Sequence, residues 1–238
     1  MTTTHSLSGL IGSSVGKKLM SGLTGLALVG FVVVHLLGNL TLFIGAEAMN
    51  TYSYTLQNAA GGYLVYVAEA ILSLVFLVHI VSGIQVALSK SRARPAGSRY
   101  TITANAGATS RKSSSSTTMI YTGVLLLAFV IFHLISFKFG PSESDGYIAV
   151  YDGVEMRDMY RLVVERFKNP LYTFGYVTMM ALLGWHLRHG IWSAFQSLGL
   201  NNRKLLPLTT ALGGVLAVAL AVGFIVLPLY VYWFALAG

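Results

Sequence analysis

Five long apolar stretches alternate with polar segments along the chain, and each is long enough to form a membrane-spanning helix. A helix needs about 20 mainly apolar residues to cross the hydrocarbon core of a bilayer. The stretches that meet this requirement are 18–44, 63–88, 117–140, 169–195 and 206–234. Pro170 and Pro207 suit the first turn of a helix, whereas Pro228 should kink the last helix near its end. The pattern predicts an all-α integral membrane bundle of five transmembrane helices, forming a single membrane domain over residues 1–238.

The polar segments between these stretches differ in charge. Segment 90–118 is rich in Ser and Thr and holds six basic residues and no acid, which predicts a solvated loop. Segment 139–170 holds six of the eight carboxylates, and its apolar periodicity predicts a short surface helix near 156–167. Before the first span, residues 7–15 form a short amphipathic stretch that suits the membrane surface. No internal repeat is evident along the chain.

Composition agrees with a membrane location, because 55% of the residues are hydrophobic and only 10% are charged. The net charge of +8 could indicate a nucleic-acid partner, so the distribution of charge decides between the two interpretations. With the N-terminus inside, eleven of the sixteen basic residues lie on the inner side and all eight acids lie in the outer half. Lys and Arg gather on the cytoplasmic side of membrane proteins. We therefore predict a multi-pass protein of the cell's inner (cytoplasmic) membrane, with its N-terminus cytoplasmic, its C-terminus outside and no nucleic-acid partner.

Histidine is the only obvious metal ligand, because the chain has no cysteine. Four of the six histidines lie well inside apolar spans, one on each of the first four: His35, His79, His133 and His186, whereas His189 lies one turn nearer the inner end of the fourth span. An ionisable residue in a membrane span is by default a functional hypothesis, because burial without a partner costs several kcal/mol. A single histidine could instead bond a neighbouring backbone carbonyl. Four histidines at matched depth favour a shared function.

Counting residues from the helix ends sorts these histidines into two levels. His35 and His133 come 17 and 16 residues after the inner ends of helices that run outward, so both lie in the outer half. His79 and His186 come 16 and 17 residues after the outer ends of helices that run inward, so both lie in the inner half. Each pair can supply both axial nitrogens to one haem iron, with the levels about 10 to 15 Å apart. We therefore predict two b-type haems.

Residues beside these histidines add to the haem interpretation. A glycine follows three of the histidines by three or four positions, so a flat macrocycle could lie against each helix, although glycines also let helices pack. These glycines are Gly38, Gly83 and Gly190. His189 lies one turn beyond His186 and next to Arg188. It could contact a haem propionate with Arg188, compete as an axial ligand, or face the lipid head groups.

Three segments of the chain carry motifs of a known family. The first is GKKLMSGLTGLALVGFVVVHLLGNLTLFIGAEAMNTYSY, where a basic start leads to a histidine, an L-x-G-N-L motif and a polar aromatic loop. The second is AEAILSLVFLVHIVSGIQVALSKSRARPAGSRY, and the third is HLRHGIWSAFQSLGLNN. Together they resemble the cytochrome b membrane anchor of succinate dehydrogenase and quinol:fumarate reductase, in its single-anchor, five-helix, two-haem form.

The resemblance implies that His79 and His186 bind the haem nearer the cytoplasm and that His35 and His133 bind the haem nearer the outside. This agrees with the count of depth. It also implies two soluble partners docked on the inner face, a flavoprotein subunit that interconverts succinate and fumarate and an iron-sulfur subunit, in a complex that can form a higher oligomer. The chain would pass electrons between the iron-sulfur subunit and a membrane quinone, menaquinone in this form of the family. Succinate chemistry would lie in a partner, and the direction of electron flow stays open.

A quinone site needs polar residues that lie near a haem and are open to lipid. The candidates around the outer haem are Glu47, Asn50, Tyr52, Tyr54 and Glu69. Glu69 could instead be an interfacial carboxylate at a helix N-terminus, and the tyrosines could belong to the aromatic belt.

Two other classes of membrane protein also use histidines within spans. A proton-relay transporter would line a continuous path with polar residues, whereas these spans carry few acids or amides. Another bis-histidine quinol-linked cytochrome would place two histidines on each of two helices or use a different number of helices. One histidine on each of four helices favours the succinate dehydrogenase type.

Overall fold

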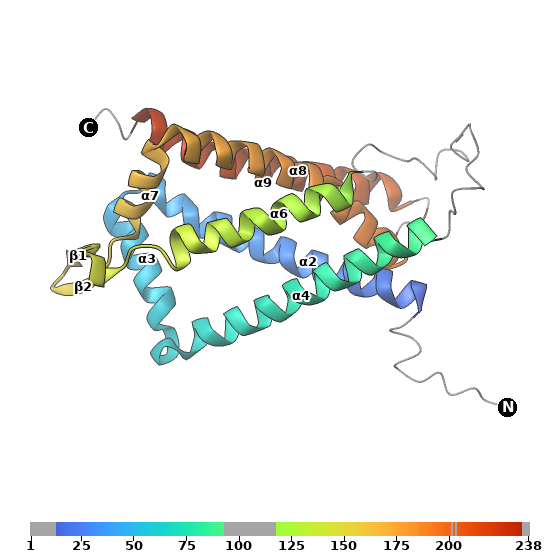
Figure 1. Ribbon diagram of the computed structural model, residues 1–238, viewed down its shortest axis with the longest axis horizontal. Helices are drawn as coiled ribbons and strands as arrows, with labels where there is room; N and C mark the ends of the chain where they lie inside the picture. The colour runs from blue at the N-terminus through green and yellow to red at the C-terminus, as the bar shows by residue number, and fades with distance from the viewer. Residues whose placement is uncertain (1–12, 93–117, 201, 203, 235–238) are drawn as a thin grey trace.

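Five long helices form the body of the molecule, and a small cap covers one end of it (Figure 1). The computed structural model describes residues 13–92, 118–200, 202 and 204–234. The long helices are α2 (Ser14–Asn39), α4 (Tyr63–Arg92), α6 (Met119–His133), α8 (Pro170–Ser197) and α9 (Leu206–Phe234). The basic loop and the amphipathic stretch expected before Ser13 fall largely outside the described residues, as does His5.

The helix ends lie close to the predicted span boundaries. The 3-10 turn η1 (Leu40–Phe43) extends α2, and the π-helix η4 (Leu134–Lys138) extends α6. Pro170 occupies the first turn of α8, and the side chain of Asn169 caps that turn by accepting a hydrogen bond from the Leu171 N–H at 2.9 Å. Helix α9 continues past Pro228 to Phe234.

Four helical segments within the described residues are long and apolar enough to cross a membrane. They are Ser14–Phe43, Ala46–Ser89, Met119–Lys138 and Leu206–Phe234. The second joins α3 (Ala46–Asn58) to α4 through η2 (Ala59–Gly62), where Ala60 and Gly61 leave helical geometry. Helix α8 is as long as the others but less apolar, because His186, Arg188 and His189 lie within it. The protein is therefore mostly helical and has the features of a multi-pass membrane protein.

The cap consists of α3, η2, η5 (Glu143–Asp145), strands β1 (Ile148–Tyr151) and β2 (Val154–Arg157), and α7 (Met159–Lys168). The strands pair antiparallel around Asp152 and Gly153, whose φ angles of 51° and 78° suit a two-residue hairpin turn. This hairpin departs from the all-α prediction. Helix α7 corresponds to the predicted surface helix but begins three residues later, because Met156 belongs to β2. Helix α3 occupies a segment that was expected to be a loop.

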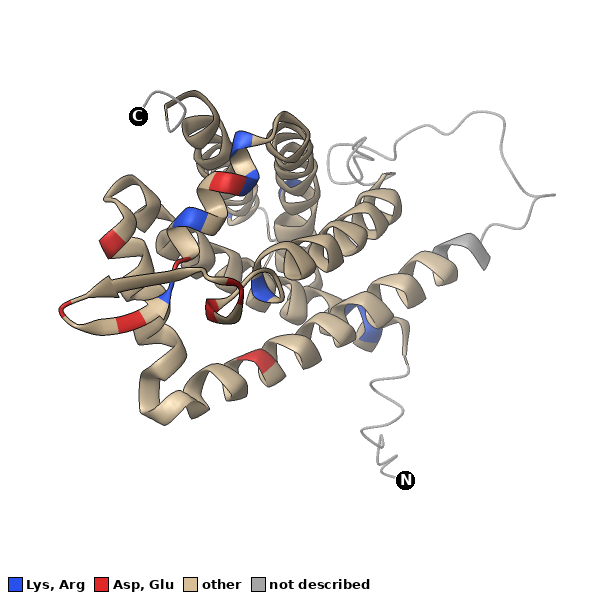
Figure 2. Ribbon diagram, turned by 60° about the vertical axis from the view of Figure 1, so that its left-hand side comes forward, with Lys and Arg blue, Asp and Glu red and all other residues tan. Residues whose placement is uncertain are grey.

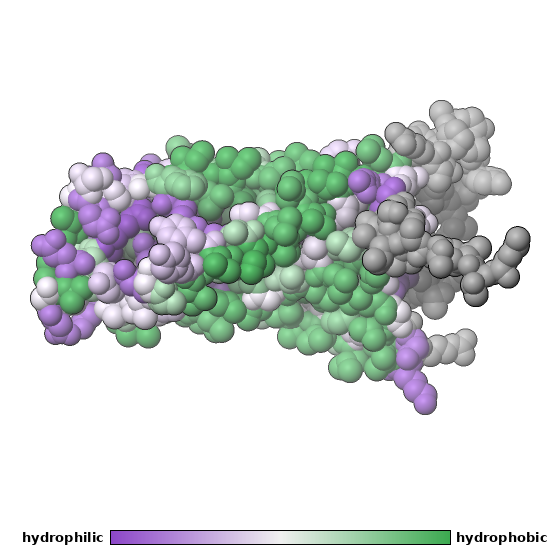
Figure 3. All heavy atoms as spheres, turned by 90° about the horizontal axis from the view of Figure 1, so that it is seen from below, coloured by the Kyte–Doolittle hydropathy of each residue, from purple (hydrophilic) through white to green (hydrophobic). Residues whose placement is uncertain are grey.

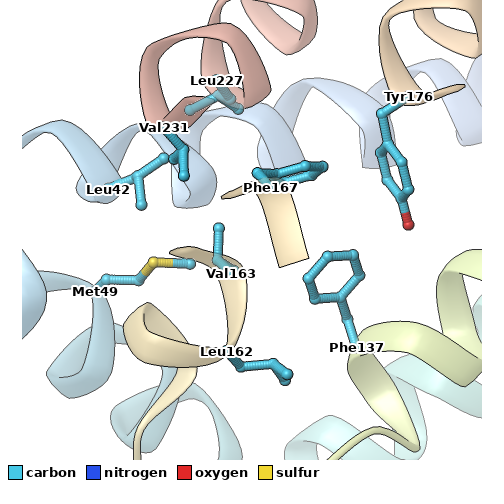
Figure 4. Close-up of a cluster of buried hydrophobic side chains, with 9 residues drawn as sticks. All are labelled: Leu42, Met49, Phe137, Leu162, Val163, Phe167, Tyr176, Leu227 and Val231. Carbon is cyan, nitrogen blue, oxygen red and sulfur yellow. The ribbon is translucent and has the colours of Figure 1, made fainter. Parts of the chain in front are cut away.

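A buried hydrophobic cluster fastens the cap to the long helices (Figure 4). Met49 of α3 and Leu162, Val163 and Phe167 of α7 lie in it beside residues of the long helices. The latter are Leu42, Phe137, Tyr176, Leu227 and Val231. A second cluster, from α2, α8 and α9, fills the body of the bundle around Ile191 and Ala217. The cap therefore packs as part of the fold.

Charge and hydropathy divide the surface into zones. Seven of the eight acids lie in the cap, and the eighth, Glu69, lies in the second turn of α4 (Figure 2). A broad apolar belt covers the long helices between the polar cap and the opposite end (Figure 3). In the cap, the Glu165 carboxylate accepts hydrogen bonds from Tyr147 and Arg161, which hold its pKa below the ordinary value. The belt has the form expected of a surface in contact with lipid.

Arg157 of β2 ties the hairpin to the end of α6. Its guanidinium donates to the carbonyl oxygens of Phe137 at 2.8 Å, Gly140 at 3.0 Å and Pro141 at 2.7 Å. We expect Arg157→Ala to lower the free energy of unfolding by about 1 to 3 kcal/mol, because carbonyls that end the π-helix lose their donor. Thermal unfolding in detergent measures the change. The exposed Arg161 is the matched control, and an equal loss in Arg161→Ala would contradict this role.

Candidate functional site

His35 and His133 meet near the cap end of the bundle, where we call them the cap-side pair. His35 projects from α2 and His133 from the last turn of α6, with ring centroids 5.8 Å apart and ring planes at 88°. Phe31 stacks on His35 at 5.4 Å, and Phe129 lies 5.9 Å from His133. The two rings thus lie within a largely aromatic environment between helices.

His79 and His186 form a second pair, the far-side pair, toward the opposite end of the long helices. His79 projects from α4 toward Thr24 of α2, and His186 projects from α8 toward Thr122 of α6. All four histidine side chains are half-buried. The four histidines come from four different helices.

Threonines on neighbouring helices contact the far-side pair. Thr24 Oγ1 of α2 lies 3.4 Å from His79 Nδ1, and Thr122 Oγ1 of α6 lies 3.0 Å from His186 Nδ1. Both threonines are buried. Each histidine of the far-side pair therefore has its Nδ1 edge against a hydroxyl of a different helix.

The cap-side histidines have other neighbours. His133 Nδ1 lies 3.3 Å from the Tyr176 hydroxyl of α8. The Asn39 amide donates to the His35 carbonyl oxygen at 2.8 Å and lies 3.5 Å from His35 Nε2. The ring of His35 is therefore held by stacking on Phe31 and by a long polar contact, whereas His133 has a hydroxyl partner.

Glycines make room for the far-side rings, but they are not the glycines expected from the sequence. A Cβ on Gly25 of α2 would lie 3.1 Å from His79 Cε1, and one on Gly123 of α6 would lie 3.6 Å from His186 Cε1. The predicted Gly38 is instead covered by Tyr52, 2.7 Å from the position of a Cβ. Among the other two expected glycines, Gly83 has no such neighbour within 4 Å and Gly190 faces a Met119 methyl at 3.4 Å.

The close approach at Gly25 has a measurable consequence. We expect Gly25→Ala to displace the His79 ring and to cost about 1 to 3 kcal/mol of stability through overpacking, measured by thermal unfolding. Gly30→Ala, on the same helix with no atom within 4 Å of a new Cβ, is the control and should be neutral or stabilising. Equal losses in both variants would show that His79 does not require this space.

The donor set fits haem. Among the described residues, no group of three or more His, Cys, Asp or Glu side chains forms a site for a metal ion. A haem brings four nitrogens of its own, so its iron needs at most two protein ligands, and histidine is a common axial ligand. Two imidazoles on opposite sides of one metal, each with a bond of about 2.0 Å, have ring centroids about 6 Å apart. The cap-side rings, at 5.8 Å, have that separation.

Two residues expected near a quinone serve in packing. Asn50 is 0% exposed; its Nδ2 donates to Asp158 Oδ1 and its Oδ1 accepts from the Tyr160 N–H, both at 2.9 Å. Its whole amide group therefore joins α3 to the start of α7. The ring of Tyr52 lies over Gly38, one turn beyond His35.

The other quinone candidates are spread over the cap end. Glu47 is exposed in the first turn of α3. Tyr54 lines an open, polar pocket of about 450 Å³ together with Tyr66, Glu155 and Arg157. Glu69 forms an ion pair with Lys138 at the end of η4, with side chains 41% and 42% exposed. The five candidates do not form one site.

His189 and Arg188 lie on α8 next to the far-side pair. His189 has its ring centroid 5.9 Å from that of Trp192, and Arg188 is exposed. Both residues are within a turn of His186 along the helix.

Sequence reasoning missed the three hydroxyl groups that touch the histidines, those of Thr24, Thr122 and Tyr176. A hydroxyl in an apolar helix is a weak signal, because it commonly bonds a carbonyl of its own helix. Only its contact with a histidine of another helix sets it apart.

Comparison with known proteins returns no match: no family model, no curated protein and no solved structure is similar to this chain.

Proposed function

We propose that the chain is the di-haem cytochrome b membrane anchor of a succinate:quinone oxidoreductase. The observation that carries the proposal is the meeting of His35 and His133 from two helices, with ring centroids 5.8 Å apart, while His79 and His186 lie on two further helices. The motif resemblance around His35, His79 and His186 gives the same pairing. A haem in each pair supplies a one-electron carrier when bound.

The chain's own residues hold these carriers at a fixed spacing. Thr24 contacts His79 and precedes His35 by 11 residues on the same helix. At the rise of an α-helix, the two levels are about 16 Å apart along the bundle. Thr122 and His133 repeat that separation. The aromatic side chains around the cap-side pair exclude water from the path.

The proposal adds α8 to the four segments that are long and apolar enough to cross a membrane, which gives five spans in the cytoplasmic membrane. The N-terminus is cytoplasmic and the C-terminus outside, so the cap faces outward. The acids in the cap and Lys17, Lys18, Arg188 and Lys204 at the opposite end support this orientation. The flavoprotein and iron-sulfur subunits dock at that basic end, and this chain holds them at the membrane.

Quinone, menaquinone in this form of the family, reacts near the cap-side haem. Glu69 precedes His79 by ten residues on α4, which moves it about 15 Å toward the cap and to the level of His35 and His133. A half-exposed carboxylate at this depth can exchange protons with quinone. Its ion-pair partner, Lys138, lies at the end of η4, which continues the helix that carries His133.

The test is a haem assay on the full chain, purified from the membrane after expression with haem supply. We expect two b-type haems per chain in a reduced-minus-oxidised spectrum, reduction of both by a menaquinol analogue, and co-purification with the flavoprotein and iron-sulfur subunits when these are co-expressed. Absence of haem would reject the cytochrome assignment. Proton flux through haem-free protein in liposomes would then support a relay transporter instead.

A further inference from the structure

Helices α2 and α6 carry the same pattern, Thr-Gly followed by nine residues and His. Residues 24–35 read TGLALVGFVVVH and residues 122–133 read TGVLLLAFVIFH, with six of the twelve positions identical. The identical positions include a Phe one turn before the histidine, Phe31 and Phe129. Inspection of the sequence alone did not reveal this repeat.

The partner helices share a second pattern. His79 of α4 and His186 of α8 are each followed by three residues and then Gly-Ile. Helix α4 packs along α2, and α8 contacts α6. The bundle therefore contains two related hairpins of helices, α2–α4 and α6–α8, and each contributes one histidine to each level.

The same contact occurs at the same position of both hairpins. In the first, Thr24 meets His79, and in the second, Thr122 meets His186. The glycine after each threonine faces the Cε1 atom of the same ring. The threonines are only 9% and 5% exposed. The same contact in both related hairpins indicates a requirement of the histidines rather than of local helix packing.

The direction of these hydrogen bonds follows from the single proton of a hydroxyl. Thr24 Oγ1 donates to the Met20 carbonyl oxygen at 2.7 Å, and Thr122 Oγ1 donates to that of Met119 at 3.1 Å. With the hydroxyl proton on a carbonyl of its own helix, each oxygen accepts from the histidine, and on this ground we assign the ring proton of both histidines to Nδ1. The lone pair of each imidazole is therefore on Nε2.

We infer that Thr24 and Thr122 are positioning residues that hold His79 and His186 in the tautomer and orientation needed for axial ligation through Nε2. This inference rests on the proposed function. A hydrogen bond from the distal N–H of a ligating histidine fixes the ring and raises the basicity of the ligating nitrogen. Greater basicity stabilises the oxidised iron, so the two threonines lower the reduction potential of the far-side haem.

The experiment uses the full chain with Thr24→Val or Thr122→Val, which removes the hydroxyl at nearly constant volume. Thr24→Ser and Thr122→Ser restore the hydroxyl. Thr178→Val is the matched control, because Thr178 is exposed on α8 and bonds only the Phe174 carbonyl oxygen of its own helix among the contacts described. Three readouts are haem affinity by titration, the midpoint potential of each haem, and the histidine tautomers by nitrogen NMR of the reduced, diamagnetic protein.

We expect each valine variant to bind the far-side haem about 10 to 100 times more weakly, with a raised potential for that haem alone. The NMR signal of a protonated Nδ1 should shift or be lost at the corresponding histidine, and serine should restore all three values. If Thr24→Val or Thr122→Val does not accumulate in the membrane, Thr24→Ala or Thr122→Ala replaces it. If the wild-type protein binds two haems and the valine variants leave the haem affinity, the midpoint potential and the NMR spectrum unchanged, the inference is overturned while the proposed function stands. A wild-type protein without haem would overturn the proposed function as well.

Discussion

Alanine at His186 should remove one of the two haems and leave the other. The same haem should be lost in His79→Ala, whereas His35→Ala and His133→Ala should each remove the second. Haem content should fall from about two per chain to about one in every variant, because a haem iron held by two histidines needs both for its six-coordinate state. Haem quantification and low-temperature electron paramagnetic resonance on the purified chain distinguish which haem remains.

The pairing is what this experiment can contradict. If His35→Ala and His79→Ala removed the same haem, the two levels would be assigned wrongly even though the chain is a cytochrome. His5→Ala is the matched control, since His5 lies in the polar segment before the first span and has no assigned role. It should retain both haems.

Asn50→Ala should lower the free energy of unfolding by about 2 to 4 kcal/mol, although Asn50 belongs to α3 of the cap and not to a helix that carries one of the four histidines. The change leaves the Tyr160 N–H without its acceptor and the Asp158 carboxylate without a buried donor. Asp158 also caps α7 by accepting from the Arg161 N–H at 2.9 Å, so the start of α7 should loosen with it. Chemical unfolding in detergent, followed by circular dichroism, measures the loss.

Asn58 provides the control for this prediction. It lies at the end of the same helix, is exposed, and donates to the Tyr54 carbonyl oxygen of its own helix at 2.9 Å. Asn58→Ala should therefore change stability by less than about 1 kcal/mol. A stable Asn50→Ala variant that no longer oxidises quinol would contradict the packing role and return Asn50 to the quinone site.

The long helices were predictable because their signal is large and local. A run of about 20 apolar residues has few alternatives to a membrane helix, and Pro170 marks the start of α8 directly. The count of depth assigns His35 and His133 to one level because the rise per residue is nearly constant along a helix, and the structure places their rings 5.8 Å apart. Helix α3 was missed because its polar composition resembles a loop, and its burial of Met49 and Asn50 depends on contacts with distant residues. The Asp152-Gly153 pair is typical of a hairpin turn, but the apolar periodicity of the residues that follow it favoured a helix.

The four candidate histidines were predictable from the sequence, and their surroundings were less so. His35, His79, His133 and His186 stand out because histidine is rare and costly in lipid. Thr24 and Thr122 do not, since their chemistry becomes visible only when a second helix brings an imidazole against them. Gly38 was expected to face a macrocycle, but Tyr52 covers it, and Tyr52 belongs to the helix that the sequence did not reveal.

The position of α4 bears on how the protein matures. This helix packs mainly along α2 and α3 and has few direct contacts with α8. A ligand bound by both His79 and His186 would therefore cross-link α4 and α8, which have few direct contacts of their own. Insertion of the cofactor would then be a late step of assembly, and a chain deprived of it would leave α4 as the helix most accessible to proteases and to quality control in the membrane.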